Sequence, residues 1–187
     1  IGSGLVGSEM CIRDRYEIIR RREQSIETFR TAEKEQIMSE GKMRFGCLVK
    51  KGVAEVRERD LPEIGEYDVL LKMKACNICT TDYGQWLGLR EHQGYPMAGG
   101  HEAAGIVQKV GSKVADFKIG DLVATGYEGC GNCSACRNGQ VDQCADIRKD
   151  TEDGYRWGFF GFSDYCVKSV RGIYKIAASV NLSLIHI

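Results

Sequence analysis

The sequence predicts a mainly β protein with a small lobe held together by four cysteines. Short runs rich in aliphatic and β-branched residues are separated by glycines, which is typical of a sandwich or barrel and not of alternating βα units. Later in the chain, cysteines recur with the pattern C-x2-C-x2-C-x7-C, which is typical of a metal site. The 187 residues suffice for one domain with a real core.

Seven runs are expected to form strands, and no long core helix is expected between residues 44 and 178. In chain order the runs are GCLVKKG, VAEVRERD, DVLLKMKAC, AAGIVQKVG, DLVATGYE, DYCVKSV and IYKIA, which cover residues 46–52, 53–60, 68–76, 103–111, 121–128, 164–170 and 173–177.

Both ends of the chain are expected to lie outside this domain. Residues 1–37 are interpreted as non-native sequence or an upstream leader, and 184–187 as a scar, because GSGLVGSEMCIRDR and LSLIHI resemble translated sequencing-adapter DNA. The charged stretch 13–40 could form a solvated helix with Ile19, Ile26 and Phe29 on one stripe, yet pack little against the domain. Met38 and Met43 are alternative starts.

The first residues, IGSGLVG, match a dinucleotide-binding pattern through Gly2, Gly4 and Gly7. That pattern binds pyrophosphate only between a strand and a helix, and a single residue precedes Gly2. We therefore interpret the match as accidental.

Charge and hydropathy exclude several classes of partner. The formal net charge is zero, which argues against nucleic acid and anionic membrane surfaces. No apolar run approaches the ~20 residues that span a bilayer, and no signal peptide is recognised, so we expect a cytoplasmic protein without a membrane partner. The nine cysteines are an odd number, which favours metal binding over a full disulfide framework.

Four of these cysteines are predicted to hold structural zinc in a lobe over residues 126–147. Two-residue gaps let thiolates turn toward one centre. Four thiolates then form a closed tetrahedral shell, in which each pair of sulfurs is about 3.8 Å apart. An iron–sulfur cluster is the alternative, but the ferredoxin run ends in x3-C-P, unlike this one. The predicted ligands are Cys130, Cys133, Cys136 and Cys144.

A second, open zinc site is predicted upstream. Cys79 and His101 are zinc ligands on separate segments, about 3.6 Å apart if they share a metal. Asp82 is expected within about 3.2 Å of the imidazole, as a hydrogen-bonded orienting group. Glu102, next to His101 in the sequence, adds a carboxylate near the same site. One alternative is that His101 is a structural histidine. Another is that Cys79 forms a redox pair with Cys76, but we expect Cys76 to face the core instead.

These motifs together resemble the zinc-containing alcohol dehydrogenases of the medium-chain dehydrogenase/reductase superfamily. The matching stretches are G-H-E-x2-G-x5-G-x2-V at 100–114, C-T-T-D at 79–82, and DFKIGDLV leading into the lobe. The resemblance runs from about residue 44 to 182. It implies a GroES-like, partly open β-barrel over 38–183, and a Rossmann domain for NAD or NADP that lies beyond residue 187.

The resemblance also implies roles for individual side chains. Cys79 and His101 would bind the catalytic zinc, with Glu102 beside it as a third group that binds or exchanges with the metal. Thr81 would hydrogen-bond the substrate alcohol and pass on its proton. We count Asp82 as the second catalytic residue, because it is expected to orient the imidazole of His101.

Three departures from the family pattern stand out. Gly84 occupies the place of a histidine that often completes the proton relay. Thr80 replaces an arginine that faces the cofactor pyrophosphate in some relatives, which alters this cofactor contact. The remaining zinc ligand would lie past the chain end, and His186 is rejected as part of the scar.

The expected function is that of a catalytic-domain fragment, inactive alone, of a zinc- and NAD(P)-dependent alcohol or polyol dehydrogenase. Hydride would pass between a zinc-bound alcohol and nicotinamide. We expect two zinc ions per full-length chain, a small alcohol or polyol as substrate, and a homo-oligomer. The alternative is a non-enzymatic zinc module with one metal. Candidate pocket residues are Gln85, Trp86, His92 and Tyr95, of which Trp86 and Tyr95 suit the core equally well.

Overall fold

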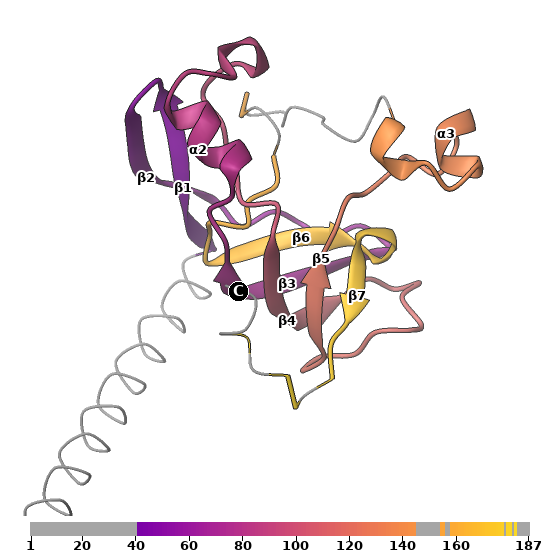
Figure 1. The fold of residues 1–187 in the computed structure, drawn as a ribbon. Coiled ribbons are helices and arrows are strands. Elements are labelled where there is room, and N and C mark those ends of the chain that lie inside the picture. Colours follow the sequence, from indigo (N-terminus) through magenta and orange to yellow (C-terminus); the bar gives the residue numbers. More distant parts are fainter. Residues whose placement is uncertain (1–40, 145–153, 156–157, 178, 181, 183–187) are drawn as a thin grey trace, which may run out of the picture. The chain divides into compact units, whose positions relative to one another are not determined.

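The computed structural model describes residues 41–144, 154–155, 158–177, 179–180 and 182 (Figure 1). The chain divides into units 1–42 and 43–187, and nearly all described residues belong to the second. The expectations for the glycine pattern, for the stripe of Ile19, Ile26 and Phe29, and for the last residues fall outside the described part.

In the described part of the chain, seven strands form at the seven predicted places, together with two short α-helices and three short 3-10 helices. In chain order they are β1 (Lys42–Lys50), β2 (Val53–Asp60), β3 (Asp68–Cys76), α2 (Thr80–Trp86), η1 (Glu91–Gln93), β4 (Ala103–Val110), β5 (Leu122–Thr125), α3 (Ser134–Arg137), η2 (Val141–Gln143), β6 (Tyr165–Ser169), η3 (Val170–Gly172) and β7 (Ile173–Lys175).

The strands build a curved, partly open sheet. Five strands pair in the order β6-β3-β4-β5-β7, all antiparallel, while β1 and β2 form a separate hairpin. Isolated bridges from Phe45 to Ser163 and from Leu48 to Met97 join β1 to neighbouring segments. The expected mainly β fold with a partly open barrel is thus confirmed.

The apolar core lies on the inner face of the five-stranded sheet. Alternate residues of a strand face one side, so Val69 and Leu71 of β3 meet Val107 of β4 there. Val123 and Ile173 complete this fully buried cluster. Leu70 is buried as well, so the interior strand β3 is covered on both faces.

Helices are brief in the part of the chain that the structure describes, as expected. The longer one, α2, has seven residues and follows β3 after a three-residue link. The other, α3, packs on η2 within the four-cysteine lobe, which extends from the end of β5 in Figure 1. Within the described ranges, no helix is long and apolar enough to cross a membrane.

Candidate metal centres

The N-terminus of α2 fixes the position of the Cys79 thiol. Cys79 is the N-cap, and its sulfur accepts a hydrogen bond from the Thr81 backbone amide at 3.2 Å. In return, Asp82 Oδ2 accepts from the Cys79 amide at 3.1 Å, which completes a capping box with cysteine in place of serine. The cap therefore orients both side chains without any metal.

His101 reaches this sulfur from the segment that leads into β4. Its Nε2 lies 3.1 Å from Cys79 Sγ, closer than the distance expected around a shared zinc, and both residues are half-buried. A backbone bond from Asn77 N to Glu102 O, 2.9 Å long, ties the two segments together. The predicted convergence of Cys79 and His101 is confirmed.

The approach depends on Gly100, which has a φ of +88°. A methyl group at Gly100 would lie 2.5 Å from the Phe162 backbone nitrogen and 2.9 Å from the Cys76 sulfur. Only glycine combines this left-handed backbone with so close a passage.

The predicted hydrogen bond between Asp82 and the imidazole of His101 is absent. Its Oδ1 lies 3.9 Å from His101 Nδ1, beyond hydrogen-bond distance, instead of the predicted 3.2 Å or less. The reason is local, because the capping bond to Cys79 holds the carboxylate at the start of α2. Oδ1 is buried and has no hydrogen-bond partner, although Cys79, Asp82 and His101 offer ligand atoms within 4.8 Å of one another.

The other predicted residues lie around this group of three. Thr81 is half-buried and lies two residues after the N-cap, whereas Thr80, directly after it, is exposed. Glu102 is exposed, and its carboxylate is not part of the converging group.

Cys76 stays outside the metal-competent group. It is half-buried, and its sulfur lies next to the backbone of Gly100 and Gly161 instead of in the apolar core that we expected. Burial, followed by the negative charges of Asp82 and Glu102, raises the pKa of this thiol to about 12. A neutral thiol is a poor partner for redox exchange, which argues against a Cys76–Cys79 redox pair.

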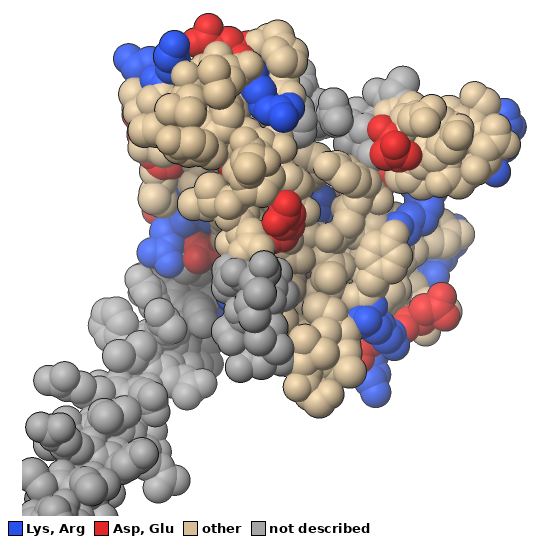
Figure 2. Space-filling model, viewed as in Figure 1, with Lys and Arg blue, Asp and Glu red and all other residues tan. Residues whose placement is uncertain are grey.

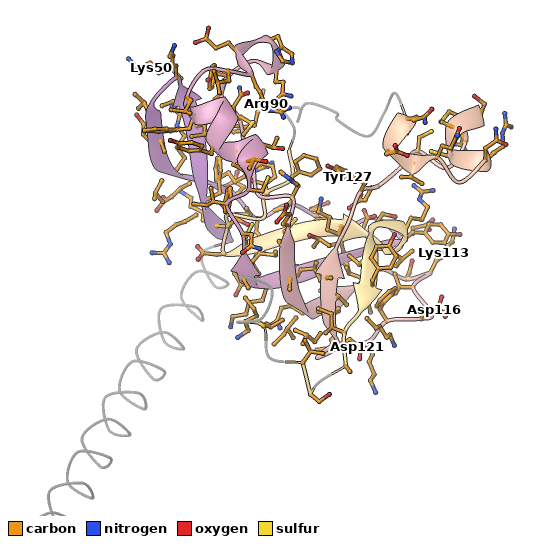
Figure 3. All side chains as sticks on the ribbon, in the orientation of Figure 1. Lys50, Arg90, Lys113, Asp116, Asp121 and Tyr127 are labelled. Carbon is orange, nitrogen blue, oxygen red and sulfur yellow. The ribbon has the colours of Figure 1, made fainter. Side chains whose placement is uncertain are left out.

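Two aromatic side chains that the sequence analysis missed surround His101. Tyr127, which follows β5 and is labelled in Figure 3, stacks on the imidazole with ring centroids 6.5 Å apart. Phe159 contacts it at 5.7 Å. The only sequence signal was the aromatic run of residues 159–162, which begins fifteen residues after Cys144.

The four lobe cysteines converge as predicted. Their sulfurs all lie within 4.8 Å of one another. Backbone amides donate to three of them: Cys130 N to Cys144 Sγ at 3.3 Å, Cys133 N to Cys130 Sγ at 3.3 Å, and Cys136 N to Cys133 Sγ at 3.4 Å. Such donors stabilise thiolates, so the lobe is built to hold negative sulfur.

Electrostatics indicates that this cluster requires a cation. A backbone hydrogen bond from Gly131 lowers the pKa of Cys136, but desolvation and bonds to the other three thiols raise it to about 12 overall. Four thiolates cannot share so small a volume unless a positive charge balances them. Soft sulfur donors in this number suit zinc, and the closed set leaves no position for a substrate.

Basic and acidic side chains connect the lobe to the sheet. Arg171 of η3 reaches the lobe, because a methyl group at Gly131 would lie 2.9 Å from its Nη1. Lys168 of β6 is buried, and its Nζ lies 3.5 Å from Oε1 of Glu128, near the start of the lobe. On the face shown in Figure 2, basic and acidic groups are interspersed and do not form a single-sign patch.

A cavity of about 410 Å³ lies between the β1–β2 hairpin and α2. Trp86 and Asp82 line it together with Ile78 and Met97. Of the other suggested pocket residues, His92 is exposed, and Tyr95 is half-buried with its hydroxyl bonded to Gln85 O. Gln85 is fully buried and donates to Gly94 O at 3.0 Å, so its side chain anchors a loop.

Comparison with known proteins gives concordant matches. The family model described as the alcohol dehydrogenase GroES-like domain matches residues 65–178. An alcohol dehydrogenase from Geobacillus stearothermophilus is 32% identical over 128 residues, which is 65% of this chain and 36% of the relative. L-galactonate-5-dehydrogenase from Escherichia coli K12 is 34% identical over 120 residues, covering 63% and 34% of the two chains.

Solved structures agree with these matches. An alcohol dehydrogenase from Escherichia coli CFT073, solved in complex with NADH, superposes with a TM-score of 0.64 at 28% identity. The superposition covers 75% of this chain and 40% of that one. The chain thus spans about a third of the length of the two curated relatives above.

Proposed function

Because the chain belongs to the zinc-containing alcohol dehydrogenase family, whose GroES-like domain matches more than half of it, we propose that it is the catalytic domain of a zinc- and NAD(P)-dependent alcohol or polyol dehydrogenase. The proposed domain covers residues 38–183. In the whole protein, a second domain would bind the nicotinamide cofactor, and the chain without it would be inactive.

The observation that carries the proposal is the contact between Cys79 Sγ and His101 Nε2 at 3.1 Å, beside the unpartnered Oδ1 of Asp82. Soft and borderline donors that converge from two segments suit zinc, and so few protein ligands leave room for a substrate. A purely structural module needs only the closed four-cysteine lobe.

Each centre has a proposed role. The lobe thiols Cys130, Cys133, Cys136 and Cys144 would hold a structural zinc. Cys79 and His101 would hold the catalytic zinc, with Glu102 as an exchanging group. Zinc in such an open site supplies Lewis-acid polarisation, which lowers the pKa of an alcohol.

The chain's own residues would then bind and deprotonate the substrate. Thr81 would pass on the alcohol proton, because its Oγ1 would take that proton while releasing its own hydroxyl proton to solvent or another residue. Thr81 stands half-buried in the first turn of α2, near Cys79. Asp82 would hold Cys79 in place through its backbone amide. Tyr127 and Phe159 would limit the rotation of His101 and shield it from water.

The relatives narrow the substrate class and the cofactor. One acts on alcohols, another on L-galactonate, and a structural relative binds NADH. We propose a small alcohol or polyol as substrate and NAD or NADP as hydride acceptor, with Thr80 near the cofactor phosphates. A homo-oligomer is expected for the whole protein.

Zinc counting tests the proposal. The wild-type whole protein, purified with zinc, should contain two zinc ions per chain by mass spectrometry, and its Cys79→Ser variant should contain one, because serine is a poor zinc ligand. In the whole protein, the same variant should abolish NAD(P)-dependent alcohol oxidation.

Cys76→Ser is the matched control, because this nearby thiol stays neutral and lies outside the converging group. It should retain both zinc ions. A wild-type whole protein with one zinc per chain, unaffected by Cys79→Ser, would favour the non-enzymatic zinc module instead.

A further inference from the structure

Arg90 occupies the space above Gly84 on α2. A methyl group at Gly84 would lie 3.3 Å from Arg90 Nε and 3.5 Å from its Cδ, so the arginine stem leaves little room for a side chain at position 84. The arginine stem thus covers the helix where position 84 has no side chain. Figure 3 shows Arg90 beside α2.

This surface of α2 is the one that carries Thr81. Residues three and four apart on a helix are neighbours, with Cβ atoms about 5–6 Å apart. Gly84 is therefore adjacent to Thr80 and Thr81, and the guanidinium of Arg90 lies about one helical turn from the proposed substrate hydroxyl.

The loop that carries Arg90 is fixed in place. The buried amide of Gln85 donates to Gly94 O at 3.0 Å, and Tyr95 donates its hydroxyl proton to Gln85 O. Backbone bonds from Leu89 N to Gly84 O and from Gln93 N to Arg90 O, each 2.9 Å, close the turn. The arginine is thus presented on a built loop.

The guanidinium has no carboxylate partner among the residues that the structure describes, although Arg90 is half-buried. Glu91, its neighbour in sequence, approaches Gly88 together with Lys51 instead. Arginine keeps its charge at any physiological pH and presents a planar fork that binds carboxylate or phosphate through two hydrogen bonds. A partly desolvated, unpaired arginine next to a substrate site is suited to a negatively charged group.

We infer that Arg90 is a specificity-determining residue that recognises an oxyanion, carboxylate or phosphate, on the carbon chain of the alcohol substrate. The inference rests on the proposed function, because it places the substrate hydroxyl at Thr81. The preferred substrate is then an acidic polyol and not a neutral one.

Isothermal titration of the zinc-loaded whole protein tests this with three six-carbon probes: gluconate, sorbitol and sorbitol 6-phosphate. At least one anionic probe should bind about tenfold or more tightly than sorbitol, as expected for a charge-assisted hydrogen-bonded pair. Tighter binding of gluconate would identify the recognised group as a carboxylate, and tighter binding of sorbitol 6-phosphate would identify it as a phosphate.

Arg90→Gln should remove this preference and leave sorbitol binding unchanged, whereas Arg90→Lys should retain part of it. Lys109→Gln removes the same charge from an exposed position of β4 and should keep the full preference. Equal binding of all three probes, binding of none, or an equal loss in Lys109→Gln would overturn the inference.

Cobalt substitution separates this inference from the proposed function. Co²⁺ bound at Cys79 gives a thiolate charge-transfer band that Cys79→Ser should lose. If the band is present but the probes bind equally, only the role of Arg90 is wrong. If no such band exists, the catalytic centre itself is wrong.

Discussion

Cys79 uses one sulfur for two purposes. It caps α2 by accepting the Thr81 amide at 3.2 Å, and it faces His101 Nε2 at 3.1 Å. Asp82 divides its two oxygens similarly, because Oδ2 is bonded to the cap and Oδ1 is left toward the imidazole. The backbone thus places the candidate ligands before any metal arrives, which reduces the entropy cost of binding.

Cys166 is predicted to make stability depend on pH. Its thiol donates to Phe159 O at 3.2 Å, and burial raises its pKa above the ordinary value of 9.0. The folded chain therefore keeps this proton while the unfolded chain loses it. Stability should fall as pH rises above about 9, by up to about 1.4 kcal/mol per pH unit from this group.

Urea unfolding of the zinc-loaded chain between pH 7.5 and 10 measures this effect. Cys166→Ala should be less stable at neutral pH but should show a shallower decline. Val123→Ala, another buried substitution without a titrating group, should keep the wild-type decline. Parallel curves for wild type and Cys166→Ala would contradict the prediction.

At the scale of the elements, the segment before β4 pairs with the segment before β6, and this pairing leaves little room for added side chains. Phe159 N donates to Ala98 O and Gly161 N to Gly99 O, both at 3.1 Å, so the two segments run side by side. This pairing places Phe159 in contact with His101 and holds Gly100 directly before His101 in a tightly packed position. The centre therefore depends on a backbone contact that crosses sixty residues of sequence.

Gly161→Ala should destabilise the chain by about 3 kcal/mol or more, because its methyl group would collide with the Gly100 carbonyl oxygen. The oxygen belongs to the backbone and the position of the methyl carbon is fixed by the backbone, so neither can turn aside. The midpoint of thermal or urea unfolding measures the loss.

Gly46→Ala is the matched control. It also lies in a backbone-paired position, but its methyl group would meet Phe162 Cβ at an ordinary 3.4 Å. It should cost less than about 1 kcal/mol. Similar losses in the two variants would show that the 99–161 contact is looser than described.

The molecule combines two centres of different construction on one sheet. The lobe offers four sulfurs in a closed set, whereas the centre at α2 offers one sulfur, one imidazole and one carboxylate. The segment from Tyr127 to Gly129 joins them, since it leaves the stacking contact with His101 and leads to Cys130. Damage to the lobe is therefore expected to disturb His101.

Zinc removal should proceed in two phases. A chromophoric chelator should take the metal from the open centre first, because it can enter the vacant coordination position, and from the four-thiolate lobe later. Absorbance of the chelator complex follows both phases. Cys79→Ser should show the slow phase alone, and a fast phase that survives this variant would assign the labile zinc to the lobe.

The strands and the lobe were readable from the residues alone. All seven β-type runs form strands, because alternation and glycine boundaries are local properties of the chain. The convergence of the lobe cysteines followed from their spacing, since two-residue gaps allow few other arrangements. The pairing of Cys79 with His101 was anticipated from motif order.

Long-range packing settled what the sequence left open. The helix cap draws Asp82 away from hydrogen-bond distance of His101, and a capping role for cysteine has no strong sequence signal. Tyr127 and Phe159 contact His101, and Arg90 covers Gly84, only because segments from different parts of the chain pack there. Spacing along a chain specifies local geometry, but contacts between distant segments depend on the packing of the whole sheet.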